Sequence, residues 1–298
     1  MAFRDAFSGY HPLVSFLYFA LVLVCAMVLM HPVCLCISLV SALWYDVQLR
    51  GAKAVRFGLC CLLPMMLLAA VLNPAFNHEG ATILMYLPSG NPLTLESILY
   101  GLAAAAMLAA VITWFRCYAA VMTSDKFVYL FGRIIPSLSL VLSMALRFIP
   151  KCKTQLHTIR TAQRCVGRDV SQGSVIGRMR NGVKILSILV TWSLENAIET
   201  ADSMKSRGYG LPGRTAFSIY RFDSRDRLAL LWLLLCGVLV LSGALNGAFA
   251  WRYFPTLRGI AFAPLSAVCQ MCFAALCLTP VYLNGREGRK WKRLQSVT

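Results

Sequence analysis

Runs of uncharged, mostly apolar residues recur along this chain, and they constrain its fold more than any other feature. The first run, residues 12–30, contains no charged residue. A transmembrane helix needs roughly 20 apolar residues, so these runs are candidate membrane spans. Charged residues make up 14% of the chain, whereas a soluble globular domain has about 25%. The sequence therefore predicts an all-α integral membrane protein with about six transmembrane helices and one sizeable polar region.

Proline and loop residues mark where the spans begin and end. His-Pro occurs at 11–12 and again at 31–32. Because proline is tolerated in the first turn of a helix, each His-Pro is predicted to open one. Pro64 is expected to kink the third span, and residues 74–97 read as a turn-rich loop. The six predicted spans are residues 12–30, 32–46, 57–73, 98–115, 228–249 and 259–283.

Charge predicts how these spans are oriented. The net charge is +17, which in a soluble protein would raise the question of nucleic acid. In membrane proteins Lys and Arg accumulate on the cytoplasmic side, so we expect the lipid bilayer and no nucleic acid as partner. The loop at 50–56, the region 123–227 and the tail 286–293 are basic, whereas the loop 74–97 has no Lys or Arg. We therefore predict a multi-pass cell membrane protein with both termini cytoplasmic; two arginines in the short loop at 250–258 are outvoted.

The region 123–227 differs from the rest of the chain, because it holds 17 of the 29 Lys and Arg residues. A span at 134–149 would split this basic region across the membrane, so we expect these residues to lie in the membrane plane or re-enter it. A second, exposed helix is predicted at 151–165, broken from the first at Pro150. The glycine-rich residues 166–182 are the predicted connector, and another helix should run from about Val183 to Arg207. The predicted divisions are N-terminal transmembrane helices (1–122), a cytoplasmic or interfacial region (123–227), and C-terminal transmembrane helices with a basic tail (228–298).

No pattern typical of catalysis or cofactor binding is present. The chain has no phosphate-binding Gly-x-x-x-x-Gly-Lys-Ser/Thr motif. It has no Ser-His-Asp, Cys-His or His-Glu-x-x-His arrangement, and Cys269 and Cys272 have metal-ligand spacing but no second pair. No predicted span has a charged residue in its middle, as proton- or ion-coupled carriers usually do. We therefore expect no catalytic residues, cofactor or metal, and any work on a solute would be driven by a partner.

The stretch 192–210 is the main functional candidate. Leu194, Ile198, Ala201 and Met204 recur on one helical face, and acidic side chains occupy the opposite face. The helix ends in Ser206-Arg207-Gly208. Spacing alone makes this end a structural cap, because glycine commonly follows a helix and arginine complements its dipole. The Lys and Arg residues of 151–168 are open to a similar reading, as a surface facing solvent or lipid headgroups.

Residues 200–210 (Thr-Ala-Asp-Ser-Met-Lys-Ser-Arg-Gly-Tyr-Gly) closely resemble the second Ala-Arg-Gly-type motif of the transmembrane component T of energy-coupling factor (ECF) transporters. That family includes the cobalt-transport permease. Ser206 stands in the small-residue place, and Arg207 and Gly208 match the Arg-Gly pair. Residues 146–150 (Leu-Arg-Phe-Ile-Pro) and 162–169 (Ala-Gln-Arg-Cys-Val-Gly-Arg-Asp) are similar to the region that carries the first motif.

The first motif departs from the family pattern. Cys165 takes the small-residue place and Gly167 takes the glycine, but Val166 stands where the family has arginine. Arg164 or Arg168, two residues to either side, are alternative sources of the missing charge. The resemblance thus implies an ATPase-docking set of Ser206, Arg207, Gly208, Arg164, Cys165, Val166, Gly167 and Arg168.

The resemblance implies a non-catalytic coupling subunit. In such transporters this component links two cytoplasmic ABC-type ATPase subunits to a substrate-binding membrane subunit for vitamin or metal-ion uptake, through cytoplasmic coupling helices. Two alternatives remain open from the residues: a membrane scaffold whose basic face binds lipid, and a self-contained carrier. The transported solute does not follow from this sequence, because specificity lies in another polypeptide.

Overall fold

The computed structural model describes residues 5–86, 92–132, 135–168, 170–171, 174–211, 220–259 and 264–295. The chain divides into two compact units. We call Met1–Thr123 together with Tyr220–Thr298 the bundle unit, and Ser124–Ile219 the α7–α8 unit.

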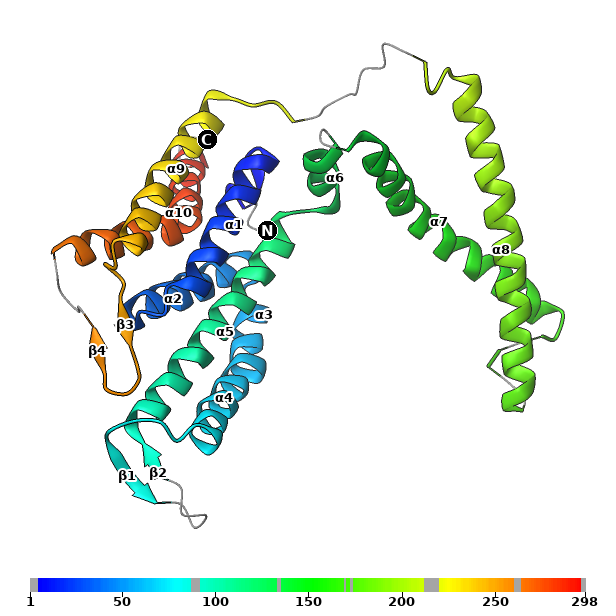
Figure 1. Cartoon of the computed structure of the whole chain (residues 1–298). Coiled ribbons are helices and arrows are strands. Elements are labelled where there is room, and N and C mark those ends of the chain that lie inside the picture. The colour runs from blue at the N-terminus through cyan, green and yellow to red at the C-terminus, as the bar shows by residue number, and fades with distance from the viewer. Residues whose placement is uncertain are drawn as a thin grey trace. The chain divides into compact units, whose positions relative to one another are not determined.

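The bundle unit is built from apolar helices (Figure 1). Among the described residues, five helices are long and apolar enough to cross a membrane, and a sixth apolar helix, α1, has 17 residues. Each of the six predicted spans overlaps one of these helices over its described residues, and the prediction of an all-α integral membrane protein is confirmed. The elements are a 3-10 turn (Phe7–Gly9), α1 (Pro12–Val28), α2 (Pro32–Arg50), α3 (Ala52–Phe57), a π-helical segment (Gly58–Leu62), α4 (Leu63–Phe76), α5 (Leu95–Val121), α9 (Ser224–Leu245) and α10 (Pro264–Gln295).

The two His-Pro dipeptides begin α1 and α2, as predicted. His11 and His31 are the residues before the first turn, and Pro12 and Pro32 are the first helical residues. Each imidazole accepts a hydrogen bond at Nδ1 from the backbone N–H two residues later, at 3.3 Å. These bonds satisfy one of the N–H groups that a helix start leaves without a partner.

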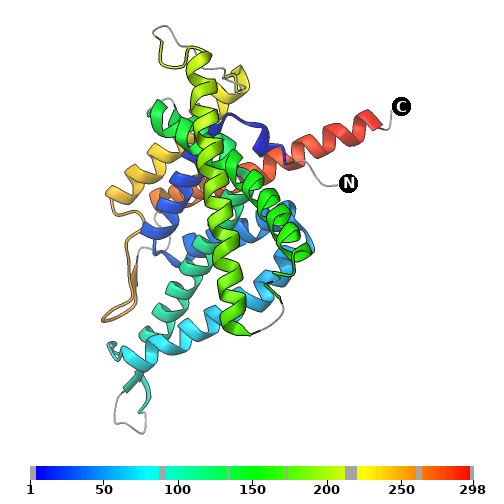
Figure 2. The ribbon, with the colours of Figure 1, turned by 90° about the vertical axis from the view of Figure 1, so that its right-hand side faces the viewer.

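Several helices extend beyond the predicted spans. α2 continues to Arg50, α5 starts at Leu95 and ends at Val121, and α10 continues to Gln295, so the basic tail 286–293 is helical. The last turns of α10 extend away from the other bundle helices (Figure 2). Hydrophobicity locates only the lipid-facing part of a helix. The polar turns beyond it therefore lie outside the predicted spans.

Two short antiparallel ribbons were not predicted. β1 (Ile83–Tyr86) pairs with β2 (Pro92–Thr94) inside the predicted loop 74–97, and β3 (Trp251–Arg252) pairs with β4 (Arg258–Gly259). The loops that carry them are joined by a hydrogen bond from the Ala81 N–H to the Pro255 carbonyl, 3.0 Å. These ribbons are too short to be recognised from alternating hydrophobicity, which needs about four to eight residues.

The core of the bundle is aromatic and lies where α5 packs against α1 and α2. Trp114, Tyr18 and Phe19 are fully buried, and their rings meet edge to face at 5.2–6.4 Å. Buried aromatic rings need a partner for each polar tip. The Trp114 Nε1–H donates to the Ser38 hydroxyl at 3.1 Å, and the Tyr18 hydroxyl donates to the Cys277 carbonyl at 3.1 Å. The core therefore links α1, α2, α5 and α10 without leaving these groups unsatisfied.

The N-terminal segment closes one end of the bundle. Asp5 accepts hydrogen bonds from the Tyr45 hydroxyl (3.0 Å) and the Asn284 amide (2.6 Å). The His11 N–H donates to Asp226, which also caps the start of α9 (3.1 Å for each bond). The end of α2, the start of α9 and the middle of α10 around Asn284 therefore lie at the same end of the bundle.

The α7–α8 unit contains three helices: α6 (Ser124–Gly132), α7 (Pro136–Cys165) and α8 (Val175–Ser206). The predicted break at Pro150 is wrong, because α7 continues through it. Proline removes its own N–H from the helical ladder and crowds the carbonyl four residues earlier, which can kink a helix without ending it. The Pro150 carbonyl is still used, because the Thr154 hydroxyl donates to it at 3.1 Å. The start of the predicted segment 134–149 lies partly outside the described residues.

The predicted connector 166–182 is too long. α8 starts at Val175 rather than near Val183, so Gly177 and Gly182 are helical. A glycine inside a helix costs about 1 kcal/mol relative to alanine but does not forbid the helix. Long runs of helix-compatible residues on both sides outweigh that cost here.

Gly243 is predicted to be essential for the packing of α9 on α10. A Cβ at this position would stand 2.5 Å from the Cys269 Sγ and 3.2 Å from its Cβ, whereas a Cβ at Gly285 would meet nothing within 4 Å. Gly243→Ala should lower the stability of the purified protein by about 1–3 kcal/mol through overpacking. Gly285→Ala, the matched control, should be neutral or stabilising by up to about 1 kcal/mol. Thermal unfolding in detergent measures both, and equal melting temperatures for the two variants would contradict the packing described here.

Candidate docking surface

The α7–α8 unit is held together by a crossing of its two long helices, seen in both views (Figures 1 and 2). Phe148 of α7 stacks on Trp192 of α8 with ring centroids 5.9 Å apart and planes 18° apart. The Lys151 ammonium lies 5.6 Å from the centre of the Trp192 ring and donates a hydrogen bond to the Asn196 side chain. An aromatic stack with a cation beside it combines apolar burial with electrostatic attraction. It gives the crossing a defined contact point.

α7 ends in a glycine-closed cap. The Gly167 N–H donates to the Arg164 carbonyl at 3.0 Å, and the Arg168 N–H donates to the Gln163 carbonyl at 2.9 Å. Gly167 has φ +75°. This pair of bonds with a left-handed glycine is the Schellman motif, which satisfies carbonyls that a helix end leaves without partners. Val166 is the last residue before the glycine, and its side chain is 68% exposed. Asp169 lies outside the described residues.

α8 ends in the same geometry. The Gly208 N–H donates to the Lys205 carbonyl at 3.0 Å, and the Tyr209 N–H donates to the Met204 carbonyl at 3.0 Å. Gly208 also has φ +75°. Arg207 therefore occupies the same backbone position at the end of α8 as Val166 does at the end of α7. Its side chain is exposed, and it has no hydrogen bond or ion pair with any residue that the structure describes.

Because the two caps have the same backbone geometry, the residues of the two motifs can be compared position by position. Cys165 and Ser206 are the last helical residues, and Arg164 and Lys205 stand one place earlier. Arg168 is equivalent to Tyr209. Both ends thus carry a cation before the last helical residue, but only α8 has one at the position that precedes the glycine.

The two caps lie near opposite ends of α8 (Figure 1). α8 has 32 residues, so at 1.5 Å per residue it is about 48 Å long. The end of α7 is joined to the start of α8 by residues 166–174. A single small ligand would not reach both caps, whereas two separate partner proteins would.

Much of α8 is apolar and uncovered within its own unit. Several side chains along its length are more than half exposed, and residues at this exposure on a folded chain mark surfaces for lipid or another protein. They are Val175, Ile176, Met179, Val183, Leu186, Leu194 and Ile198.

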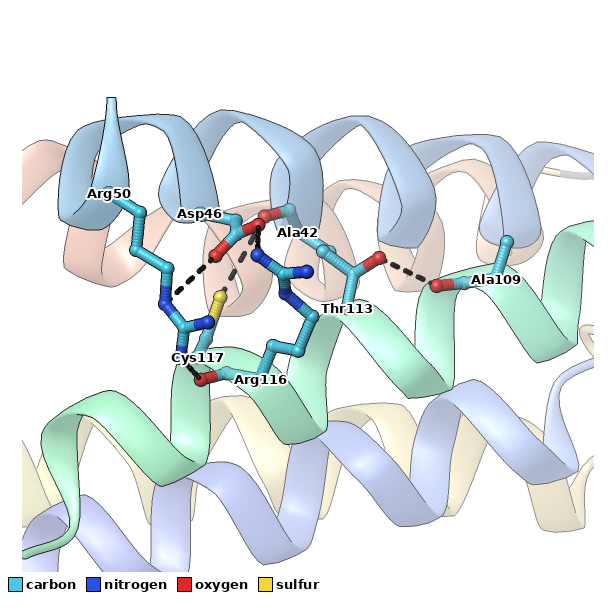
Figure 3. Close-up of polar contacts among 7 residues, drawn as sticks. All are labelled: Ala42, Asp46, Arg50, Ala109, Thr113, Arg116 and Cys117. Carbon is cyan, nitrogen blue, oxygen red and sulfur yellow. Dashed lines mark hydrogen bonds and ion pairs between the residues drawn. The ribbon is translucent and has the colours of Figure 1, made fainter. Parts of the chain in front are cut away.

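A buried ion cluster in the bundle unit was missed by the sequence analysis (Figure 3). Asp46 of α2 is 1% exposed and lies 3.2 Å from the Arg116 guanidinium of α5. Arg50 lies 3.7 Å from the other carboxylate oxygen and donates to the Arg116 carbonyl at 2.9 Å. Arg116 also sits 3.4 Å from the centre of the Phe57 ring.

The predicted spans ended too early to reveal this cluster. The predicted span 32–46 ends at Asp46, and the predicted span 98–115 ends just before Arg116, which places both residues at the membrane surface. The available signal was the spacing of Asp46 and Arg50, which stand four residues apart on one helix. The cluster pins α2, α3 and α5 together near their ends.

Comparison with known families settles the class of the chain. Residues 10–217, more than half of the chain, match the CbiQ family, described as cobalt transport protein. The chain belongs to the CbiQ family.

Curated relatives of this CbiQ-family chain are energy-coupling factor transporter transmembrane proteins, EcfT. The protein of Lacticaseibacillus paracasei is 38% identical over 112 residues, which is 37% of this chain and 40% of that protein. The proteins of Lactobacillus helveticus (37% over 109 residues; 36% and 39% of the two chains) and Listeria monocytogenes (36% over 110 residues; 36% and 41%) are similar. The chain therefore spans about two-fifths of the length of these relatives.

Removing Arg116 should strongly destabilise this CbiQ-family bundle. Arg116→Met leaves the buried Asp46 carboxylate without its main partner, which typically costs about 3–5 kcal/mol. The double variant Asp46→Leu/Arg116→Met should recover most of that loss, because no charge stays buried. Arg50→Met is the control and should cost less than about 1 kcal/mol, since Arg50 is partly exposed and farther from Asp46. Thermal unfolding in detergent tests this order; a double variant as unstable as Arg116→Met would contradict it.

Proposed function

We propose that this chain is the transmembrane coupling subunit of an ECF-type ABC importer. It would transmit ATP-driven motion from two cytoplasmic ATPases to a substrate-binding membrane subunit that takes up a vitamin or a metal ion. Membership of the CbiQ family and the similarity to EcfT transporter proteins support the transport role. The observation that carries the coupling role is the pair of exposed, geometrically equivalent helix caps near opposite ends of α8.

Each cap would dock on one ATPase. At the α8 end, the Arg207 guanidinium presents several donors in a fixed plane and suits a carboxylate or carbonyl of the partner. The glycine beside it has no side chain, so a partner backbone can approach closely. Gly208 also needs to be glycine for its own conformation, because φ +75° disfavours residues with a Cβ.

The crossing of α7 and α8 would convert ATPase closure into movement. Drawing the two caps together changes the angle between the helices about the contact of Phe148 with Trp192. The exposed apolar side chains of α8 would rest against the substrate-binding subunit and carry this change of angle to it. α8 is unbroken over its 32 residues, which makes it a stiff lever.

The buried pair Asp46–Arg116 gives little support to the alternative of a self-contained carrier. Ionisable groups within membrane helices are functional candidates by default. Asp46, however, is paired with Arg116 near the ends of α2 and α5, and this arrangement favours a structural role. The alternative of a lipid-binding scaffold predicts no retention of ATPases and binding that salt alone removes.

Charge reversal at Arg207 is predicted to release the ATPase that docks at the α8 end. We expect Arg207→Glu to lower co-purification of that subunit at least roughly tenfold, because an attractive contact becomes a repulsive one. ATP-dependent uptake should fall with it. Lys184→Glu is the matched control, since Lys184 is an exposed cation on the same helix, far from the cap. Full retention of both ATPases and full uptake by Arg207→Glu would exclude the docking role.

We further propose that both termini are cytoplasmic. Arg50, Lys53 and Arg225 lie at the end of the bundle that holds the N-terminal segment. The segments joined at the other end by the bond from Ala81 to Pro255 carry two arginines and two glutamates: Arg252, Arg258, Glu79 and Glu96. A green fluorescent protein fused to the C-terminus should fluoresce, and alkaline phosphatase fused there should be inactive. Phosphatase fused within the loop near Leu257 should be active, and the reverse pattern would invert the topology.

A further inference from the structure

A basic recess lies on α7 just before its cap. Its volume is about 300 Å³, and it is lined by His157, Arg160, Thr161, Arg164 and Ser171. The four α7 residues are spaced three and four apart, so they form one stripe of the helix. Among the residues that the structure describes, the lining has two guanidinium groups and an imidazole and no carboxylate. The Arg160 side chain makes no hydrogen bond or ion pair with any residue that the structure describes.

The equivalent stripe of α8 has a different character. Because Val166 and Arg207 occupy the same position in equivalent caps, residues of α7 correspond to residues of α8 that are 41 places later. The α7 residues His157, Arg160, Thr161 and Arg164 therefore correspond to Ile198, Ala201, Asp202 and Lys205. The α8 stripe has one cation and one anion, whereas the α7 stripe has two cations and an imidazole. The α7 end, which has no arginine at the position before its glycine, is therefore the end whose stripe carries the extra cations.

We propose that this recess is the socket for an acidic side chain of the ATPase that docks at the α7 end. Arg160 and Arg164, which stand six and two residues before Val166 on α7, supply the charge that Val166 does not. Val166 itself makes an apolar contact with the same partner. This inference rests on the proposed function, because it names how one of the two docking contacts is made.

The recess favours a partner carboxylate over other anions. It opens beside the exposed cap, so a protein seated on Val166 would reach it without a second binding event. A carboxylate accepts hydrogen bonds from two guanidinium groups at once, and Arg160 and Arg164 stand one turn apart on α7. A lipid phosphate offers similar chemistry, and the experiment separates the two sources.

Co-purification with the ATPase subunits tests the charge. Arg160→Glu should weaken retention of the α7-end ATPase roughly tenfold or more, because it places an anion where the partner's anion sits. Lys153→Glu, an equal charge reversal on an exposed part of α7 outside the recess, should have little effect. Unchanged retention in Arg160→Glu would overturn the socket. A monodisperse peak in size-exclusion chromatography and an unchanged melting temperature establish that each variant is folded.

Carbodiimide cross-linking identifies the partner group directly. In the assembled complex, the amine of the Arg160→Lys variant should form an amide with an acidic residue of one ATPase, which peptide mass spectrometry locates. Reversing the charge of that acidic residue should restore binding to Arg160→Glu. A cross-link to a carboxylate of this chain, or no cross-link, would overturn the proposal. If Arg160→Glu lost binding to anionic-lipid vesicles while its ATPase retention was unchanged, the recess would be a lipid site and the proposal would be overturned.

These outcomes are separable from failure of the proposed function. If the unmodified chain retains no ATPase, the coupling role fails. If Arg207→Glu loses one ATPase while Arg160→Glu retains both and gives no cross-link, the coupling role stands and only the socket fails.

Discussion

The proposed coupling role depends on the Schellman caps that end α7 and α8. A helix end leaves carbonyls without partners, and a left-handed glycine with two backbone hydrogen bonds satisfies them. Both helices use this solution, with Gly167 and Gly208 at the same φ of +75°. The side chain before each glycine is then exposed rather than folded back onto its own helix. Since the caps are equivalent, the exchange of arginine for valine between them is a difference in surface chemistry on the same backbone. The two proposed docking contacts would therefore differ in chemistry.

A different physical constraint applies to the bundle unit: a charge that is buried in it needs a partner of opposite charge. The Asp46–Arg116 pair, with Arg50 beside it, joins α2 and α5 near their ends. Buried ion pairs contribute less to stability than their Coulomb attraction suggests, but losing one partner is costly. The aromatic core around Trp114 supplies apolar contact in the same helices. Together these contacts hold α5 against its neighbours in the bundle, α1, α2 and α4.

The sequence predicted the class and most helix positions, because both follow from hydrophobicity and proline placement. The His-Pro starts of α1 and α2 are an example, since proline and a capping acceptor act locally. The break at Pro150 and the connector 166–182 were wrong, because local helix breakers were given more weight than the long helical runs around them. Asp46 and Arg116 were missed because their pairing joins residues 70 positions apart (46 and 116). The docking role of the two motifs is still a prediction, and it depends on partners that are other polypeptides.

The most direct test of this account is photo-cross-linking from the two cap positions within the assembled transporter. A photoreactive amino acid placed at position 166 or at position 207 should cross-link to an ATPase, and native mass spectrometry should find two ATPase subunits for each copy of this chain. Because α8 is about 48 Å long, the two positions should reach separate ATPase subunits. Cross-links only to lipid or to this chain, or cross-links from both positions to one and the same subunit, would contradict the account.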